Sequence, residues 1–399
     1  MWTIFHTEAS GGWGGQEIRI LAESLGMRAR GHRVVIIAEG GSGIMEKAAG
    51  AGLETIAVSF RKKDYPRTFV RLARLMGELG ADFINTHSSR DSWLASLAAK
   101  ALPGGPFVIR TRHISTPVAT NLAASIIYRR LPDGIVTTAE AIRRQLITRN
   151  GVDPDRVVSI PTGVDTGVFD PAGRYGDVRG ELGLDARTPL VGMVSVLRSW
   201  KGHDYFIEAA ALVAGKVPEA RFLVAGDGPR RDDIKRIIAE HGLGGRVLMI
   251  GHREDVPAVL ASLDVFVQPS YANEGIPQSV MQAMAMEVPV VASDLPPFRE
   301  LVTDGDTGLL VPARDPRALA DRIVLLLGDR ALGARLGKGA RRLVTERFSV
   351  ERMLDSTEEL YGRISRAGHG GMDEESSGGE GGETGGGRGG RAAGGSAHA

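Results

Sequence analysis

A single carboxylate and a single amide stand at a spacing suited to holding a polar ligand. Glu274 lies in the loop "YANEGIP", and Gln282 follows eight positions later, in a segment that Pro277 opens as a helix. A carboxylate near a helix start also stabilises the helix dipole by about 0.3–1 kcal/mol, and Gln282 is equally compatible with a surface position. The loop follows a strand, however, and ligands bind outside the carboxyl ends of parallel strands. We therefore interpret this pair as part of a ligand site.

Two cations occupy a similar place earlier in the chain. Arg198 and Lys201 lie in "VSVLRSWKGHDYF", between the end of a strand and the start of a helix. A guanidinium and an ammonium at this place form a suitable clamp for a diphosphate, although the stretch alone is equally compatible with a solvated basic loop. The turn "VAGDGP", which contains Gly226, is a common strand-to-helix turn and by itself indicates no function.

The first loop, "HTEASGGWGGQE", contains four glycines: Gly11, Gly12, Gly14 and Gly15. Glycines allow the backbone to approach a ligand closely, and the following helix offers free N–H groups to an anion. The dinucleotide-binding fingerprint is excluded because Glu17 stands where its third glycine belongs. A flexible connection is the alternative, but four glycines are more than a turn requires, so we favour a ligand loop.

Length and composition fit a two-domain globular protein. The chain has 399 residues, of which 42% are hydrophobic and 24% charged, and it has no cysteine, which excludes disulfides and thiolate metal sites. Residues 1–170 carry 21 Lys and Arg against 16 Asp and Glu, an excess too small for a nucleic-acid partner but compatible with an anionic ligand or membrane surface. We find no signal peptide and no apolar run of about 20 residues, and therefore expect a cytoplasmic protein.

Apolar β-branched runs alternate with helical patterns, which favours an α/β fold with doubly wound parallel sheets. The pattern restarts after a loop at 161–177, so we expect two Rossmann-like domains, 1–170 and 171–365, facing a central cleft. The last helix could cross back to the first domain. Residues 366–399, rich in glycine, are expected to form a disordered tail. The strand candidates are 2–7, 33–39, 54–60, 82–88, 107–112, 134–139, 157–161, 190–196, 221–227, 246–251, 265–270, 288–293 and 308–312.

Six segments in sequence order resemble the family-4 glycosyltransferases of the GT-B fold, which are retaining enzymes with nucleotide-sugar donors. They are the Gly-rich first loop, "IPTGVD" (160–165), "KGHDYFIEAA" (201–210), "VAGDGP" (224–229), "EGIPQSVMQAMAMEVPVVAS" (274–293) and "ELVTDGDTGLLVPARDP" (300–316). The resemblance covers residues 2–365 and implies two nucleotide-fold domains that transfer a sugar.

The resemblance also implies roles for individual residues. Lys201 matches a lysine that contacts the donor diphosphate, Glu274 matches the first acid of an E-x7-E pattern, which contacts the donor sugar, and His113 matches a histidine beside that sugar. Gln282 replaces the second acid, which holds the ribose, but an amide both donates and accepts and can still hold a diol. The expected catalytic residues are Glu274, His113 and Lys201, and the expected donor-binding residues are Arg198, Gly14, Gly15, Gly226, Gly275, Ile276 and Gln282.

Two further features bear on the leaving group. Val196 stands where the family has an arginine, and Arg198 lies two residues later. The sequences "DPD" (153–155) and "DGD" (304–306) resemble the metal-binding motif of other glycosyltransferases, but both lie in turns, where capping explains them. Fixed cations and helix N–H groups can stabilise a leaving diphosphate without a metal. We therefore expect metal-independent catalysis and no cofactor.

The first domain should bind the acceptor, a glycan or glycolipid of lipopolysaccharide-core or exopolysaccharide type. His87 and Arg90, in "THSSRDSW", are candidate contacts. The basic stretch 60–75 is compatible with peripheral contact with the inner membrane surface, although a solvated helix with its apolar stripe in the core is the simpler interpretation. A nucleotide-sugar epimerase of the same fold and a catalytically degenerate sugar-nucleotide-binding protein are the alternative functions.

Overall fold

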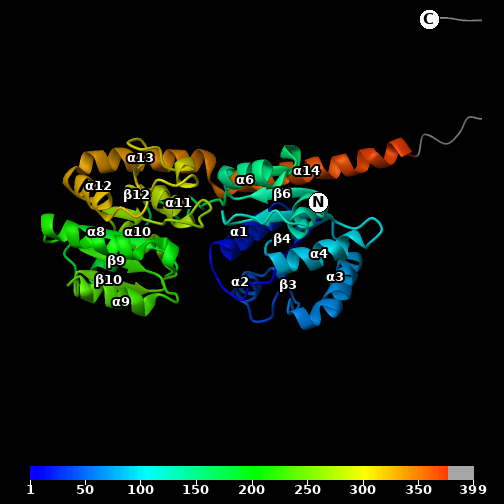
Figure 1. The fold of residues 1–399 in the computed structure, drawn as a ribbon, viewed down its shortest axis with the longest axis horizontal. Coiled ribbons are helices and arrows are strands. Elements are labelled where there is room, and N and C mark those ends of the chain that lie inside the picture. Colours follow the sequence, from blue (N-terminus) through cyan, green and yellow to red (C-terminus); the bar gives the residue numbers. More distant parts are fainter. Residues whose placement is uncertain (376–399) are drawn as a thin grey trace, which may run out of the picture.

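The structure, a computed structural model, describes residues 1–375 and contains two parallel sheets, each flanked by helices (Figure 1). The strand order is β3-β2-β1-β4-β5-β6-β7 in the first sheet and β10-β9-β8-β11-β12-β13 in the second. Every strand overlaps a segment that the sequence predicts as one, and β1 extends one residue past its predicted segment, to Glu8. The strands are β1 Thr3–Glu8, β2 Arg33–Ala38, β3 Glu54–Ala57, β4 Phe83–Thr86, β5 Phe107–Arg112, β6 Gly134–Thr137, β7 Val157–Ser159, β8 Leu190–Val194, β9 Arg221–Ala225, β10 Val247–Gly251, β11 Val265–Gln268, β12 Val290–Ser293 and β13 Leu309–Val311.

Helices connect successive strands and cover both faces of each sheet (Figure 1). The helices are α1 Gly15–Ala29, α2 Gly43–Gly50, α3 Tyr65–Leu79, α4 Ser89–Lys100, α5 Leu122–Ser125, α6 Glu140–Asn150, α7 Val178–Glu181, α8 His203–Lys216, α9 Arg231–Glu240, α10 Val256–Ala261, α11 Gln278–Ala285, α12 Pro316–Gly328, α13 Arg330–Arg347 and α14 Val350–Glu375. The short turns are η1 Lys62–Asp64, η2 Ile126–Arg130, η3 Pro154–Arg156, η4 Ser199–Lys201 and η5 Phe298–Glu300.

Burial on both faces explains why the strands are continuously apolar. Each residue of β11 and of β12 is buried, as a parallel sheet covered by helices requires. In each sheet the strand order reverses beside the first strand, between β1 and β4 and between β8 and β11. Crevices form at such points, outside the carboxyl ends of the strands. The loops that the sequence marks as ligand loops follow these strands.

The apolar stripe of α3 faces the core, as the simpler of the two sequence interpretations predicted. Leu72 is fully buried, and Phe69 and Leu75 pack against the same core beneath the first sheet. The basic residues of α3 are therefore displayed on its outer face. In the described part of the chain, no helix is both long enough and apolar enough to cross a membrane.

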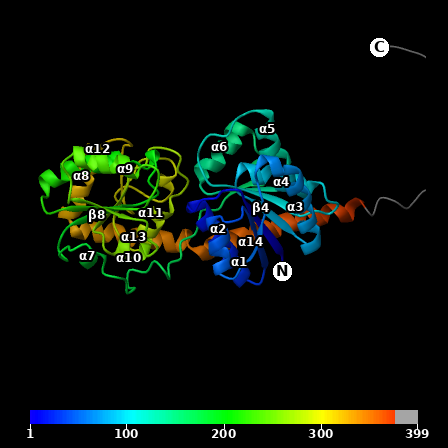
Figure 2. The ribbon, with the colours of Figure 1, turned by 90° about the horizontal axis from the view of Figure 1, so that it is seen from below.

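Helix α14 leaves the second domain and packs along the first (Figures 1 and 2). The ring of Tyr361 stacks on Phe83 of β4, with centroids 4.4 Å apart, and its hydroxyl accepts a hydrogen bond from the Asn85 amide at 3.3 Å. Arg30 of α1 binds the carboxylates of Asp355 and Glu358. The crossing that the sequence allowed therefore takes place.

The same helix continues to Glu375, whereas the sequence placed the start of a disordered tail at 366. Once the first turns of a helix are docked, each added residue gains a hydrogen bond without a new nucleation cost, so the helix extends past its docked part. The remainder of the predicted tail, 376–399, lies outside the described residues.

Replacing Tyr361 with alanine should lower the free energy of unfolding of the first domain by about 3–5 kcal/mol, the usual cost of deleting a buried aromatic ring. Tyr361 is fully buried, so the substitution leaves a cavity beside Phe83. Urea unfolding followed by circular dichroism measures the change, with the exposed neighbour Glu359→Ala as the control. Equal stability of the Tyr361→Ala and control proteins would show that this ring does not anchor α14.

Candidate active site

Lys201 lies between β8 and α8, at the end of the turn η4. The next residue, Gly202, has a φ of 78°, and a Cβ there would lie 2.0 Å from the carbonyl oxygen of Pro269. Only glycine satisfies both constraints. The Tyr271 N–H also donates to the Trp200 carbonyl at 2.9 Å. These contacts hold the loop after β8 against the loop after β11.

Lys201 and Glu274 form a close ion pair across these two loops. Lys201 Nζ donates to Oε1 of Glu274 at 2.7 Å and to Oε2 at 3.0 Å. The two side chains are only 18% and 7% exposed, so water screens their attraction weakly. Removing either partner would leave the other charge poorly solvated and unpaired. The two residues that the sequence predicts to act together are thus in direct contact.

The loop that carries Glu274 meets the first domain at its next residue. A Cβ on Gly275 would lie 2.7 Å from the carbonyl oxygen of His113 and 2.8 Å from Oγ1 of Thr138. One residue earlier, Asn273 Oδ1 accepts a hydrogen bond from Thr116 Oγ1 at 3.2 Å. Glycine is therefore needed at 275 for the two domains to approach. His113 is brought beside the Glu274 loop by this approach.

The side chain of Ile276 anchors the loop, whereas the backbone N–H groups around it are unbonded in the part of the chain that the structure describes. The Ile276 side chain is buried in an apolar cluster that includes Ala139 and Ile142 of the first domain. The N–H groups of Gly275 and Ile276 make no hydrogen bond within residues 1–375. The following helix, α11, has no side-chain cap at its N-terminus. Free N–H groups of this kind suit anionic oxygens.

Two further polar contacts join the domains, one through Glu300 and one farther away through Lys47. The Glu300 carboxylate accepts hydrogen bonds from the N–H groups of Glu140 and Ala141, at 2.8 and 2.9 Å, and so caps α6 from the opposite domain. Farther away, Lys47 Nζ of α2 lies 2.8 Å from Oε1 of Glu254 in the loop after β10. The first contact is partly buried and the second is exposed. Glu300 therefore contributes more to the fixed domain arrangement.

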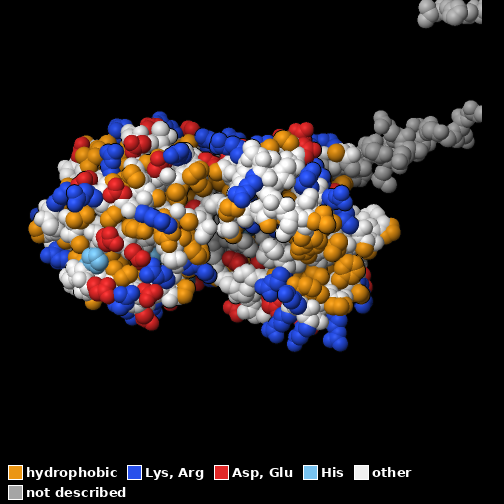
Figure 3. Space-filling view, viewed as in Figure 1, with side chains coloured by type: hydrophobic (Ala, Val, Ile, Leu, Met, Phe, Trp, Pro, Cys, Tyr) orange, Lys and Arg blue, Asp and Glu red, His pale blue; other side chains and the backbone are white. Residues whose placement is uncertain are grey.

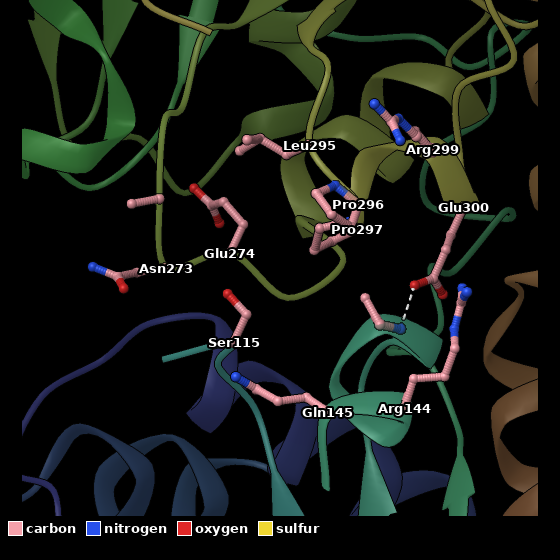
Figure 4. Close-up of a pocket in the computed structure, with 12 residues that line it drawn as sticks. Ser115, Arg144, Gln145, Asn273, Glu274, Leu295, Pro296, Pro297, Arg299 and Glu300 are labelled. Atoms are coloured by element: carbon pink, nitrogen blue, oxygen red, sulfur yellow. Dashed lines mark hydrogen bonds between the residues drawn. The ribbon is translucent and has the colours of Figure 1, made fainter. Parts of the chain in front are cut away.

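A cavity of about 660 Å³ lies between the domains beside Glu274. The surface is hollowed in this region (Figure 3), and Ser115 and Gln145 of the first domain point toward Asn273 and Glu274 of the second (Figure 4). Arg144 lies on its rim and makes no ion pair within the described residues. The cavity combines hydroxyl and amide groups with two arginines, Arg144 and Arg299, and with the carboxylates of Glu274 and Glu300. Arg299 is paired with Asp294, and the lining as a whole suits a hydroxylated ligand.

The first loop is organised by Glu8, at the end of β1. Its carboxylate accepts hydrogen bonds from the Ser10 N–H at 2.7 Å and from the Gln16 amide. Gly14 precedes α1, which has no side-chain cap, and a Cβ on Gly15 would meet nothing within 4 Å. Packing therefore does not require glycine at 15. An open backbone here agrees with a ligand loop, the interpretation favoured by the sequence.

The other predicted donor-binding residues lie around this centre with differing roles. Arg198 is exposed, with its guanidinium 5.4 Å from the ring centre of Trp200. Gly226 has a φ of 137°, and a Cβ there would lie 1.9 Å from the Ser195 carbonyl oxygen, so packing alone explains this glycine. Gln282 is half-buried on α11, and its side-chain amide makes no hydrogen bond in the described part of the chain. Its amide is thus available to a ligand.

Of the two candidate acceptor contacts, His87 is buried and Arg90 is exposed. His87 is only 5% exposed, and both of its ring nitrogens are bonded to other histidines, so it lies behind His113 rather than at an acceptor surface. Arg90 is exposed, but its guanidinium donates to the Ala9 carbonyl at 3.0 Å and steadies the first loop. A sequence pattern does not show whether the side chain that follows a strand, such as that of His87, is buried or exposed.

Several site residues carry no local sequence signal. Ser115, Gln145 and Glu300 reach the cleft only because the domains meet, which no pattern within one segment reveals. The D-x-D sequences do act in turns: Asp153 caps η3, and Asp304 Oδ1 accepts from the Leu310 N–H at 2.9 Å. Within the described residues, no three His, Cys, Asp or Glu side chains are grouped to hold a metal ion.

Both halves of the chain are similar to known glycosyltransferases. Residues 13–168 match the family model "Glycosyltransferase Family 4", and residues 176–343 match "Glycosyl transferases group 1". The UDP-Gal:alpha-D-GlcNAc-diphosphoundecaprenol alpha-1,3-galactosyltransferase of Escherichia coli is 28% identical over 310 residues, which cover 74% of this chain and 79% of that protein. A lipopolysaccharide core biosynthesis mannosyltransferase of Rhizobium meliloti is 32% identical over 212 residues, which cover 51% of this chain and 60% of the relative.

A solved structure shows the same fold over nearly the whole chain. The Anabaena protein HepE in complex with UDP-glucose superposes with a TM-score of 0.80 at 20% identity, over 92% of this chain and 100% of that chain. Two paired nucleotide-fold domains and the two adjoining family matches define a GT-B glycosyltransferase. The chain belongs to the family-4 glycosyltransferases, as its sequence motifs indicated.

Replacing Glu8 with glutamine should flatten the dependence of stability on pH. Burial, and then the nearby carboxyl of Asp91, raises the pKa of Glu8 to about 8 from the usual 4.5. The protonated form therefore stabilises the fold, and this stability is lost as the pH rises from about 4.5 to about 8. Melting temperatures at pH 5 and pH 8 measure the loss, with the exposed Glu46→Gln of α2 as the control. Equal losses in wild type and Glu8→Gln would contradict the assignment.

Proposed function

We propose that this glycosyltransferase moves a sugar from a nucleotide-sugar donor to a glycan or glycolipid acceptor, with retention of configuration and without a metal ion. The observation that carries the proposal is the Lys201–Glu274 ion pair in a loop whose Gly275 lies against His113. A cation and a carboxylate of the second domain thereby lie at a loop that contacts the His113 backbone of the first domain.

Donor binding would use this ion pair as its starting point. A diphosphate carries more negative charge than a carboxylate, so it competes with Glu274 for the Lys201 ammonium. The released carboxylate can accept hydrogen bonds from hydroxyls of the sugar, while the free N–H groups of Gly275 and Ile276 donate to phosphate oxygens. The Anabaena structure contains UDP-glucose, and the E. coli relative is named for UDP-Gal, which supports a uridine nucleotide.

The transfer step needs charge stabilisation at the leaving group. The bond between the anomeric carbon and the diphosphate oxygen breaks, a bond from the acceptor oxygen forms on the same face, and the acceptor proton passes to the departing diphosphate. The Lys201 ammonium and the N–H groups of the 274–276 loop face the developing negative charge. These fixed groups can replace a metal ion in this role. A nucleophilic Glu274 is the alternative route to retention.

The cavity beside Glu274 supports binding of a hydroxylated acceptor. Ser115 and Gln145 can exchange hydrogen bonds with glycan hydroxyls, and the unpaired Arg144 suits a phosphate group (Figure 4). The E. coli relative is named for a diphosphoundecaprenol-linked acceptor, and the Rhizobium relative for lipopolysaccharide core biosynthesis. Both names favour a glycolipid acceptor.

Peripheral contact with an anionic membrane surface fits the outer face of the first domain. Four exposed basic residues make no ion pair in residues 1–375: Lys62 and Lys63 of η1, directly before α3, and Arg67 and Arg71 of α3 (together the basic α3 face). Each basic residue near an anionic surface contributes about 1 kcal/mol. Because the apolar stripe of α3 packs in the core, this contact would be electrostatic and sensitive to salt.

Replacing Glu274 with alanine should lower the rate of sugar transfer at least 10- to 100-fold, as expected for loss of a charge-assisted hydrogen bond to the donor sugar. The rate is followed as nucleoside diphosphate released from a panel of nucleotide sugars, with and without a lipid extract as the acceptor. A near-normal rate would reject the role of Glu274. Interconverted sugar without release would indicate an epimerase, and binding without turnover a degenerate binding protein.

Gln282→Ala is the matched variant on the same loop and helix. It should weaken the affinity for the nucleoside diphosphate alone, because its amide is assigned to the ribose, and it should change the rate at saturating donor much less. Isothermal titration with UDP measures the affinity. An unchanged affinity would contradict the ribose assignment while leaving the role of Glu274 intact.

Neutralising the basic α3 face, by changing Lys62, Lys63, Arg67 and Arg71 to glutamine, should abolish binding to vesicles that contain phosphatidylglycerol. Co-sedimentation at low salt measures the bound fraction, with neutral phosphatidylcholine vesicles for comparison. The control changes three exposed basic residues of α9 in the other domain, Arg231, Lys235 and Arg236. Undiminished binding of the α3 variant would place the membrane contact elsewhere or exclude it.

A further inference from the structure

Three histidines form a continuous hydrogen-bonded row at the carboxyl edge of the first sheet. His6 lies in β1, His87 directly follows β4, and His113 directly follows β5, and these three strands are neighbours. His6 Nδ1 is 3.0 Å from His87 Nε2, and His87 Nδ1 is 3.0 Å from His113 Nε2. The row therefore leads from the buried sheet to the residue beside the Glu274 loop.

The surroundings of the row keep its imidazoles neutral. His6 is fully buried and His87 is 5% exposed. Burial lowers the pKa of all three histidines, and the fully buried Arg19 guanidinium acts in the same direction on each. The Glu23 carboxylate opposes this effect at His6, but the pKa of His6 is still lowered. Arg110 lowers the pKa of His87 and His113 further. A charged imidazole in this row would lack the solvation that it has in water.

Because the imidazoles are neutral, all hydrogen bonds in the row run in the same direction. A neutral imidazole has one N–H donor and one nitrogen acceptor, so His87 donates to one neighbour and accepts from the other. Two arrangements satisfy both bonds: all three protons lie on Nδ1, or all three lie on Nε2. The two arrangements differ in which end atom carries a proton, His113 Nδ1 in the first and His6 Nε2 in the second. Neither atom has a hydrogen-bond partner within the described residues.

The buried end selects between these arrangements. His6 Nε2 is inaccessible and unpaired, so a proton there would be a buried N–H without an acceptor, which is rare in folded proteins. Protons on Nδ1 leave only a bare lone pair at that end. At the other end, the His113 residue is half-buried and its Nδ1 is neither enclosed nor bonded within the described residues, so a proton there can bind a ligand oxygen.

We propose that His6 and His87 are positioning residues that hold His113 neutral with its proton on Nδ1, so that His113 presents an N–H donor to an oxygen of the donor sugar. The ligand role rests on the proposed function, whereas the tautomer does not. A sugar ring or hydroxyl oxygen can accept this bond, and a bare imidazole nitrogen at the same place would instead require a donor. The row thus determines which kind of sugar oxygen His113 can bind.

Nitrogen-15 NMR of histidine-labelled protein tests the tautomer directly, without any ligand. The His113 resonances are identified by their loss in His113→Gln. We expect a protonated Nδ1 and an unprotonated Nε2 at pH 7 in wild type, and a shift toward Nε2–H in His87→Phe, which removes the donor to Nε2. A wild-type His113 with its proton on Nε2, or one that is doubly protonated, would overturn the proposal.

Turnover of nucleotide sugar tests the consequence. His87→Phe should lower kcat for release of nucleoside diphosphate about tenfold, the usual effect of one neutral hydrogen bond, and leave the KM for the donor nearly unchanged. His6→Phe, one ring farther from the cleft, should have a smaller effect in the same direction. It also serves as the second variant if His87→Phe fails to fold.

The matched control is Thr111→Val. Thr111 Oγ1 donates to Asn85 Oδ1 at 2.8 Å, so this variant loses a buried hydrogen bond in the same sheet without touching the row. Its kcat and its His113 tautomer should equal those of wild type. Equal losses of kcat in Thr111→Val and His87→Phe would reduce the row to a structural role and refute the proposal. If wild type turns over no nucleotide sugar, the proposed function fails while NMR still decides the tautomer.

Discussion

The fixed contact between the loop after β8 and the loop after β11 is the constraint on which the site depends. Gly202 allows this contact because any Cβ would collide with the carbonyl of Pro269. With the loops held together, Lys201 and Glu274 form an ion pair that is largely shielded from water. Neither charge would be stable there alone. The two loops therefore hold these opposite charges together. Under the proposed function, a donor diphosphate would bind Lys201 here while its sugar binds Glu274.

The second domain completes the site through a few short-range contacts. Gly275 lies against the His113 carbonyl, Ile276 is buried among residues of both domains, and Glu300 caps α6 across the cleft. Helix α14 ties the domains a second time by packing on the first sheet. Because each contact joins residues far apart in sequence, the cleft geometry depends on the whole fold. His113 is hydrogen-bonded to a row of histidines. We infer that the burial of His6 Nε2 sets the direction of the hydrogen bonds in this row.

The sequence could predict the strands and the ligand loops because both leave local patterns. Apolar β-branched runs mark strands that are covered on two faces, and the loop motifs indicate Lys201 and Glu274 directly. Contacts between distant segments leave no such pattern. His87 was expected at the acceptor, yet it is buried and bonds the histidines of the two neighbouring strands, and no local pattern indicates that Glu300 caps α6. Gly226 matched the family pattern, but close packing against Ser195 is sufficient to explain it.

A crystal structure of the protein with an intact nucleotide sugar would show whether the donor separates the Lys201–Glu274 ion pair. We expect the diphosphate to bind Lys201 Nζ and the Glu274 carboxylate to leave the lysine and accept hydrogen bonds from the sugar. We also expect His113 to lie beside the same sugar. A donor bound elsewhere, with the Lys201–Glu274 ion pair unchanged, would contradict it.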